Sequence, residues 1–65
     1  MQVQSVLIPK DWGIRDSEKW LYNHKFKFLK VHTTKHYFRF RQFKPIKGRK
    51  YLSKKLKNGV VLVME

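Results

Sequence analysis

The chain opens with a short apolar segment that ends at a proline. Its apolar residues are Val3, Val6, Leu7 and Ile8, and Pro9 follows directly. Apolar and polar residues do not alternate strictly here, which is typical of a strand that is covered on at least one face. The pattern therefore predicts an opening strand in the interior of a sheet.

Between residues 12 and 24 the pattern changes to the period of a helix. One side of this helix would carry Ile14, Ser17, Trp20, Leu21 and His24, and the other Arg15, Glu18, Lys19 and Tyr22. Gly13 is an acceptable N-cap, and it would place Asp16 and Glu18 in the first turns, near the positive end of the helix dipole. We expect the helix to end near His24 or Lys25.

The remainder of the chain predicts two hairpins. Residues 26–31 and 37–43 are rich in aromatic and β-branched residues and flank a polar interval at 33–36. Alternation would place Phe38 and Phe40 on one face of the second strand, and Tyr37, Arg39, Arg41 and Phe43 on the other. After a basic loop at 44–50, residues 51–56 and 60–64 would form another hairpin, because Asn58-Gly59 is a strong turn signal.

These elements predict an α+β fold: a single small domain over residues 1–65 in the order β-α-β-β-β-β, with an antiparallel-rich sheet and one helix packed on one face. The core candidates are Ile14, Trp20, Leu21, Phe38, Phe40, Val61 and Val63. A chain of 65 residues cannot hide all ten of its aromatic side chains in such a core, so we expect some to be exposed or to contact a partner.

The amount and distribution of charge along the chain indicate a class of function. The 16 lysines and arginines face only 4 acids, which gives a formal net charge of +12. No acid occurs between residues 19 and 64, and that stretch holds 14 of the 16 basic residues. Ordinary soluble surfaces mix positive and negative charges. This segregation of charge therefore predicts a polyanionic partner that binds the sheet side of the molecule.

The sharpest candidate motif is the alternating segment 37–41, in which Arg39 and Arg41 share a face with Tyr37. Guanidinium groups bind phosphate in a bidentate manner, and flat rings stack on bases or sugars. The alternative is that both arginines merely solvate an outer strand. The predicted nucleic-acid-binding residues are Lys27, Lys30, Lys35, Tyr37, Arg39, Arg41, Lys44, Lys47, Arg49, Lys50, Lys54, Lys55 and Lys57.

The sequence gives little indication of disulfides, metal binding or catalysis. There is no cysteine, so disulfides and thiolate metal sites are excluded. His32 and His36 have a spacing known from zinc ligands, but nothing nearby completes a ligand set. No serine or threonine is linked to a histidine and an acid. We therefore predict no catalytic residues, no metal, no cofactor and no small-molecule substrate.

Targeting signals also find no support in the sequence. No apolar run approaches the roughly 20 residues of a membrane span, and no leader pattern appears. We expect a protein that is not secreted and does not bind membranes.

Several short sequence motifs of this chain also occur together in other proteins. QSVLIPK at 4–10, Trp20-Leu21 followed by His24, YFRFRQ at 37–42, and Asn58-Gly59 before an apolar strand occur in this order in a short domain of large DNA viruses and some phages. Over nearly its whole length the chain resembles the small basic virion proteins of marseilleviruses. The resemblance implies an abundant packaged DNA-binding protein of the virion and the infected host cell, in its cytoplasm or nucleus. It carries over only Arg39 and Arg41 as binding residues.

The leading hypothesis is therefore a non-enzymatic, DNA-binding viral protein that neutralises backbone phosphates and takes part in genome packaging. It predicts salt-sensitive binding with little base readout, because no helix-turn-helix, zinc finger or RNA-recognition motif is present. The alternative is a structural adaptor module that binds an acidic protein. A homodimer is compatible with both hypotheses.

Overall fold

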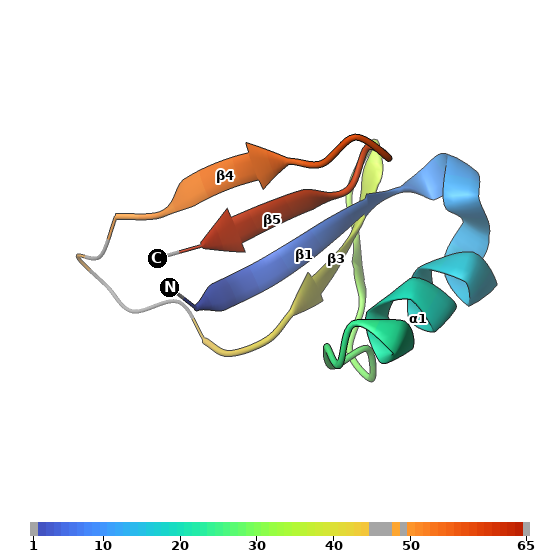
Figure 1. Cartoon of the computed structure of the whole chain (residues 1–65), viewed down its shortest axis with the longest axis horizontal. Coiled ribbons are helices and arrows are strands. Elements are labelled where there is room, and N and C mark those ends of the chain that lie inside the picture. Colours follow the sequence, from blue (N-terminus) through green and yellow to red (C-terminus); the bar gives the residue numbers. More distant parts are fainter. Residues whose placement is uncertain (1, 45–47, 49, 65) are drawn as a thin grey trace.

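One helix lies against one face of a five-stranded antiparallel sheet (Figure 1). The computed structural model describes residues 2–44, 48 and 50–64. Its elements are β1 (Val3–Pro9), the 3-10 turn η1 (Lys10–Trp12), α1 (Gly13–Asn23), β2 (His32–Thr33), β3 (Tyr37–Arg41), β4 (Leu52–Lys55) and β5 (Val61–Met64). The sheet order is β2-β3-β1-β5-β4. The α+β class and the predicted order of strands and helix are confirmed, with η1 as an addition.

Strand β1 is the centre of the sheet and contains a bulge. It pairs antiparallel with β3 on one side and with β5 on the other, and its register with β5 shifts between Val3 and Ser5. Side chains three positions apart point to opposite faces of a regular strand. The extra residue of a bulge shifts this alternation by one position, so such side chains then share a face. Val3 and Val6 therefore both pack into the core, which explains the imperfect alternation of this segment.

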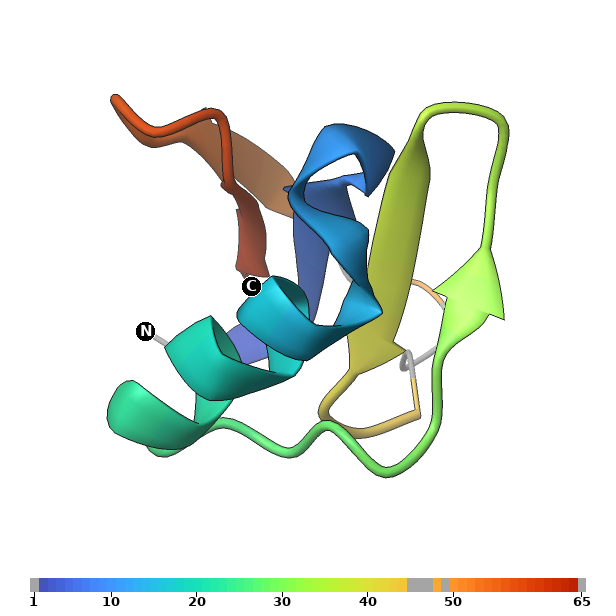
Figure 2. The same cartoon turned by 90° about the vertical axis from the view of Figure 1, so that its right-hand side faces the viewer.

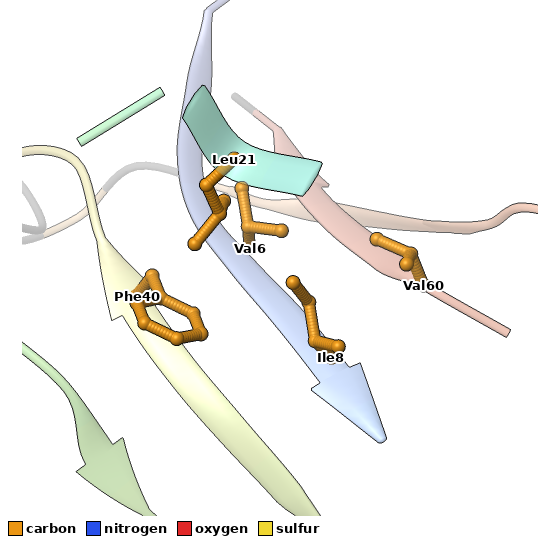
Figure 3. Close-up of a cluster of buried hydrophobic side chains, with 5 residues drawn as sticks. All are labelled: Val6, Ile8, Leu21, Phe40 and Val60. Atoms are coloured by element: carbon orange, nitrogen blue, oxygen red, sulfur yellow. The ribbon is translucent and has the colours of Figure 1, made fainter. Parts of the chain in front are cut away.

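The core lies between α1 and the middle of the sheet (Figure 3). Its fully buried apolar side chains are Val6, Ile8, Leu21, Phe40 and Val60. Leu21 reaches down from α1 onto side chains of β1 and β3, while Val60 closes the side next to β5. The prediction of Leu21 and Phe40 as core residues is confirmed, and Trp20 and Phe38 pack against the cluster from its margin.

Three core predictions were wrong. The β1–β5 register pairs Leu62 with Val6, so Val60 and Leu62 face the helix while Val61 and Val63 point to the opposite face. In an apolar run with no alternation, the sequence does not show which of the two alternating sets of side chains faces the core. Ile14 is 40% exposed, because it lies at the start of α1 beyond the edge of the cluster.

The two ends of α1 differ in how their backbone groups are satisfied. The helix begins at Gly13 with Trp12 as the N-cap and without a side-chain cap, so the predicted N-cap at Gly13 was off by one residue. Asp16 stands in the first turn as expected. At the other end, the N–H of Lys25 donates to the carbonyl of Tyr22 (3.1 Å) and the N–H of Phe26 to that of Leu21 (2.8 Å).

These two bonds form a Schellman motif, in which the residue after the C-cap adopts a left-handed conformation. Lys25 holds that position with φ of 62°. The stacked rings of Trp20 and His24, 3.9 Å apart, and of Trp20 and Phe26, 6.0 Å apart, accompany the end of the helix. The helix end near His24 is confirmed.

The first hairpin differs from its prediction in the length of its leading strand. Strand β2 contains only His32 and Thr33, and residues 26–31 are not a strand. They leave the end of α1, pass below the helix and cross to β2 at the edge of the sheet (Figure 2). The turn is held by Thr34, whose backbone N–H donates to the carbonyl of Tyr37 (2.8 Å).

The second hairpin, formed by β4 and β5, matches its prediction. Asn58 Oδ1 accepts a hydrogen bond from the N–H of Val60 (3.1 Å), and Gly59 has φ of 93°, a conformation that glycine adopts without steric cost. Of the preceding basic loop, residues 45–47 and 49 lie outside the described part of the chain.

Candidate functional site

The sheet face opposite α1, which we call the outer face, carries two arginines side by side on β3. The register places Arg39 beside Leu7 and Arg41 beside Ser5, whereas Phe38 and Phe40 pair with Ile8 and Val6 of the core. The predicted division of this strand into an aromatic inner side and a basic outer side is therefore confirmed. Two positions along a strand separate the arginine Cα atoms by about 7 Å.

No carboxylate interrupts this face within the described strands. None of the five strands contains an aspartate or a glutamate. The acids that the structure describes are Asp11, Asp16 and Glu18, and all three belong to η1 and α1. The strands therefore offer their cations no internal counter-charge, which leaves these cations available to an external anion.

Arg39 occupies a special position among these cations. It is half-buried between His32 on β2 and Leu7 on β1, and its Nε atom is buried without a hydrogen-bond partner. The stem of the side chain is thus held on the sheet while its charge is not neutralised by a carboxylate of the strands. Such a group gains more from binding an anion than a fully solvated lysine does.

A basic pocket of about 420 Å³ lies beside the end of β3. Its walls are the segment 27–32 and the end of β3 with the residues that follow. We define the basic pocket by its lining residues, which are Lys27, Leu29, Lys30, His32, Arg41, Gln42, Phe43 and Lys44. It brings together four of the predicted binding residues, Lys27, Lys30, Arg41 and Lys44, from two separate segments of the chain.

The pocket walls are joined by the side chain of Gln42. Its Oε1 accepts a hydrogen bond from the N–H of Lys27 (2.8 Å), and its Nε2 donates to the carbonyl of the same residue (2.9 Å). The side-chain amide thus replaces one rung of a β-ladder. This contact explains how residues 26–31 stay beside β3 without forming the predicted strand.

A second glutamine fixes the backbone of two residues that line the pocket. Gln4, at the bulge of β1, is 6% exposed and donates from Nε2 to the carbonyl of Phe43 (2.8 Å). Its own carbonyl accepts the N–H of Gln42 (2.7 Å), and its Oε1 accepts the hydroxyl of Ser5. The chain after β3 is therefore held by the central strand, and the pocket is already formed before a ligand arrives.

Sequence reasoning did not assign a role to either glutamine. One indication was present, since Gln4 is a polar residue inside an apolar strand, where a buried amide needs hydrogen-bond partners. Gln42 offered no such indication because it follows directly after the strand, where polar residues are common.

The remaining predicted residues are spread more widely. Tyr37 is half-buried on the outer face beside Pro9, and Lys55 lies on the same face of β4. Exposed lysines in turns and loops are Lys35, Lys50 and Lys57. Lys47 and Arg49 lie outside the described residues.

One lysine contradicts the expectation of a single basic face. Lys54 pairs with Leu62 and therefore points to the helix side of β4. The sequence places it directly beside Lys55, and neighbouring residues of a strand occupy opposite faces.

The described residues contain no group of three or more histidines, cysteines or acids that could hold a metal ion. His24 stacks on Trp20 at the end of α1, whereas His32 lines the pocket. No helix among these residues is long and apolar enough to cross a membrane.

Comparison with known proteins adds no relative. No protein-family model matches the chain, and no curated protein or solved structure matches it either. The resemblance to the marseillevirus virion proteins therefore stays a prediction.

Proposed function

We propose that this protein is a non-enzymatic nucleic-acid-binding protein, with DNA as the expected partner. The observation that carries the proposal is the arrangement of cations without counter-charge. Arg39 and Arg41 stand together on the outer face, and the basic pocket beside them adds Lys27, Lys30 and Lys44. Nucleic acid is the polyanion whose repeated phosphates suit such a row of cations.

The binding mode follows from the chemistry of these groups. Arginine binds phosphate in a bidentate manner, and lysine acts as a mobile point charge. The described part of the chain has one α-helix, and its first turns carry acids, so it is poorly suited to enter a groove of DNA. Contacts to the backbone rather than to base edges should dominate, with weak sequence preference.

The biological setting that we propose is that of the virion proteins this chain resembles. A packaged protein that neutralises phosphate would act in genome packaging, within the virion and the infected cell. The high positive charge is the property that such a role requires, since condensed DNA needs its charge neutralised.

A salt titration of binding tests the proposal. If about six cations contact phosphates, the logarithm of affinity should fall against the logarithm of salt concentration with a slope of roughly −5. Fluorescence anisotropy with a labelled oligonucleotide between about 50 and 200 mM salt would measure this slope. Affinity that does not respond to salt would contradict the proposal.

A second candidate is an adaptor that binds an acidic protein. The observation in its favour is the exposure of large apolar side chains outside the pocket, since Tyr22 is 72% and Leu52 62% exposed. Such a module would form a discrete complex with its protein partner and would bind DNA only weakly and without saturation. The titration above separates the two functions.

A further inference from the structure

The basic pocket contains two apolar residues that a purely phosphate-binding surface would not need. Leu29 is 92% exposed, which is the highest value among the exposed large apolar side chains, and Phe43 supplies a half-buried aromatic ring. Both line the same pocket as Lys27, Lys30, Arg41 and Lys44. Apolar and cationic side chains around one pocket suit a ligand that has a flat apolar part and a negative charge.

We propose that the basic pocket receives an unpaired nucleotide, so that the preferred partner is single-stranded nucleic acid. This inference rests on the proposed function and makes it more specific. A base stacked and paired within a duplex presents no free face to Phe43, whereas an unpaired base does. The volume of about 420 Å³ falls within the range of pockets that bind small organic ligands.

The pocket also has the rigidity that a stacking site requires. Gln42 fixes the wall that carries Leu29 and Lys30 through its two bonds to Lys27, and Gln4 fixes the backbone of Phe43. Affinity gains from such preorganisation, because little chain entropy is lost when the ligand binds.

Arg41 links the pocket to the rest of the outer face. Arg41 belongs to the pocket and also to the outer face, where Arg39 is the next residue on the same side of β3. A bound strand can therefore place one base in the pocket while its neighbouring phosphates contact the two arginines. This combination of a stacking platform and a basic track is typical of proteins that bind single strands without sequence preference.

The test compares three ligands of equal length, about twelve nucleotides: oligothymidylate, an abasic oligomer with the same phosphates, and a duplex. We expect oligothymidylate to bind at least roughly fivefold more tightly than the abasic oligomer at the same salt concentration, because only the former has bases that can stack. Leu29→Ser should remove most of this difference by weakening only the binding of oligothymidylate. Because Leu29 is almost fully exposed, this variant should fold normally, which circular dichroism would verify.

Leu52→Ser is the matched control, since it makes the same exchange at an exposed leucine on β4, outside the pocket. It should leave all three affinities unchanged. Equal binding of oligothymidylate and the abasic oligomer would overturn the nucleotide pocket but leave phosphate binding intact. Failure to bind any of the three ligands would overturn the proposed function together with this inference.

Discussion

The side-chain amide of Gln42 bonds both backbone polar groups of Lys27, at 2.8 and 2.9 Å. Two segments that are far apart along the chain are thereby joined without a shared strand. Because the same contact joins the walls of the basic pocket, Gln42 contributes both to the stability of the fold and to the shape of the site.

Gln42→Leu should lower the free energy of unfolding by about 1 kcal/mol. The three lost hydrogen bonds, two with Lys27 and one from Nε2 to the carbonyl of Phe40 (3.2 Å), are partly exposed to solvent. The substitution should also weaken binding of oligothymidylate, because segment 27–32 is then no longer held beside β3. Urea unfolding and anisotropy would measure the two effects. Gln2→Leu makes the same exchange at an exposed position and should change neither quantity; equal effects of the two variants would contradict the role of Gln42.

Arg39→Ala combined with Arg41→Ala should weaken DNA binding at least tenfold at low salt and make the salt slope shallower by about 2, as expected for two lost phosphate contacts. The control is Arg15→Ala combined with Lys19→Ala, which removes the same charge from exposed positions of α1. That pair should change the affinity less than threefold by our estimate, since it lies beside the acids. If both pairs act alike, binding depends on net charge and not on the outer face.

Lys25→Gly should stabilise the protein. Lys25 has φ of 62°, and the left-handed conformation costs a residue with a Cβ atom about 1 kcal/mol, which glycine avoids. Thermal unfolding should show an increase in Tm of roughly 4–8 °C. Lys19→Gly, the same exchange inside α1, should have the opposite sign. A lower Tm for Lys25→Gly would contradict this prediction. It would show that the lysine side chain stabilises the fold by more than its left-handed backbone conformation destabilises it.

Two neighbouring valines test the register of β5. Val60 is fully buried in the core, whereas Val61 is half-buried on the outer face. Val60→Ala should lower the free energy of unfolding by about 2 kcal/mol, through lost burial and the cavity that remains, and Val61→Ala by less than about 1 kcal/mol. The reverse order would mean that β5 is shifted by one residue.

The sequence allowed the fold class to be predicted because each element carries its own local pattern. The helical period around Leu21, the alternation around Phe40 and the Asn58-Gly59 turn are all short-range features. Predictions failed where the pairing of distant strands determines which side chains face the core. Nothing within residues 60–64 shows which side chains face the core, because all are apolar and the β1–β5 register sets the orientation.

For the candidate site, the sequence predicted the chemical nature of the residues but not the pocket that they form. The absence of acids from the strands and the pairing of Arg39 with Arg41 follow from the sequence and from alternation. The pocket does not, because Lys27 and Lys44 are brought together by the side chain of Gln42 and the buried amide of Gln4. Such contacts between side chain and backbone have no periodic pattern that a sequence would display.

The central place of β1 in the sheet has a consequence for the order of events during synthesis. This strand is synthesised before both of its neighbours, β3 and β5, and before Val60, which completes the core beside Ile8. Pairings between distant segments form slowly, since a long loop must close before any contact is gained. Until β5 emerges, a nascent chain presents an apolar strand with an open edge, and this edge is where chaperones or a neighbouring copy would make first contact.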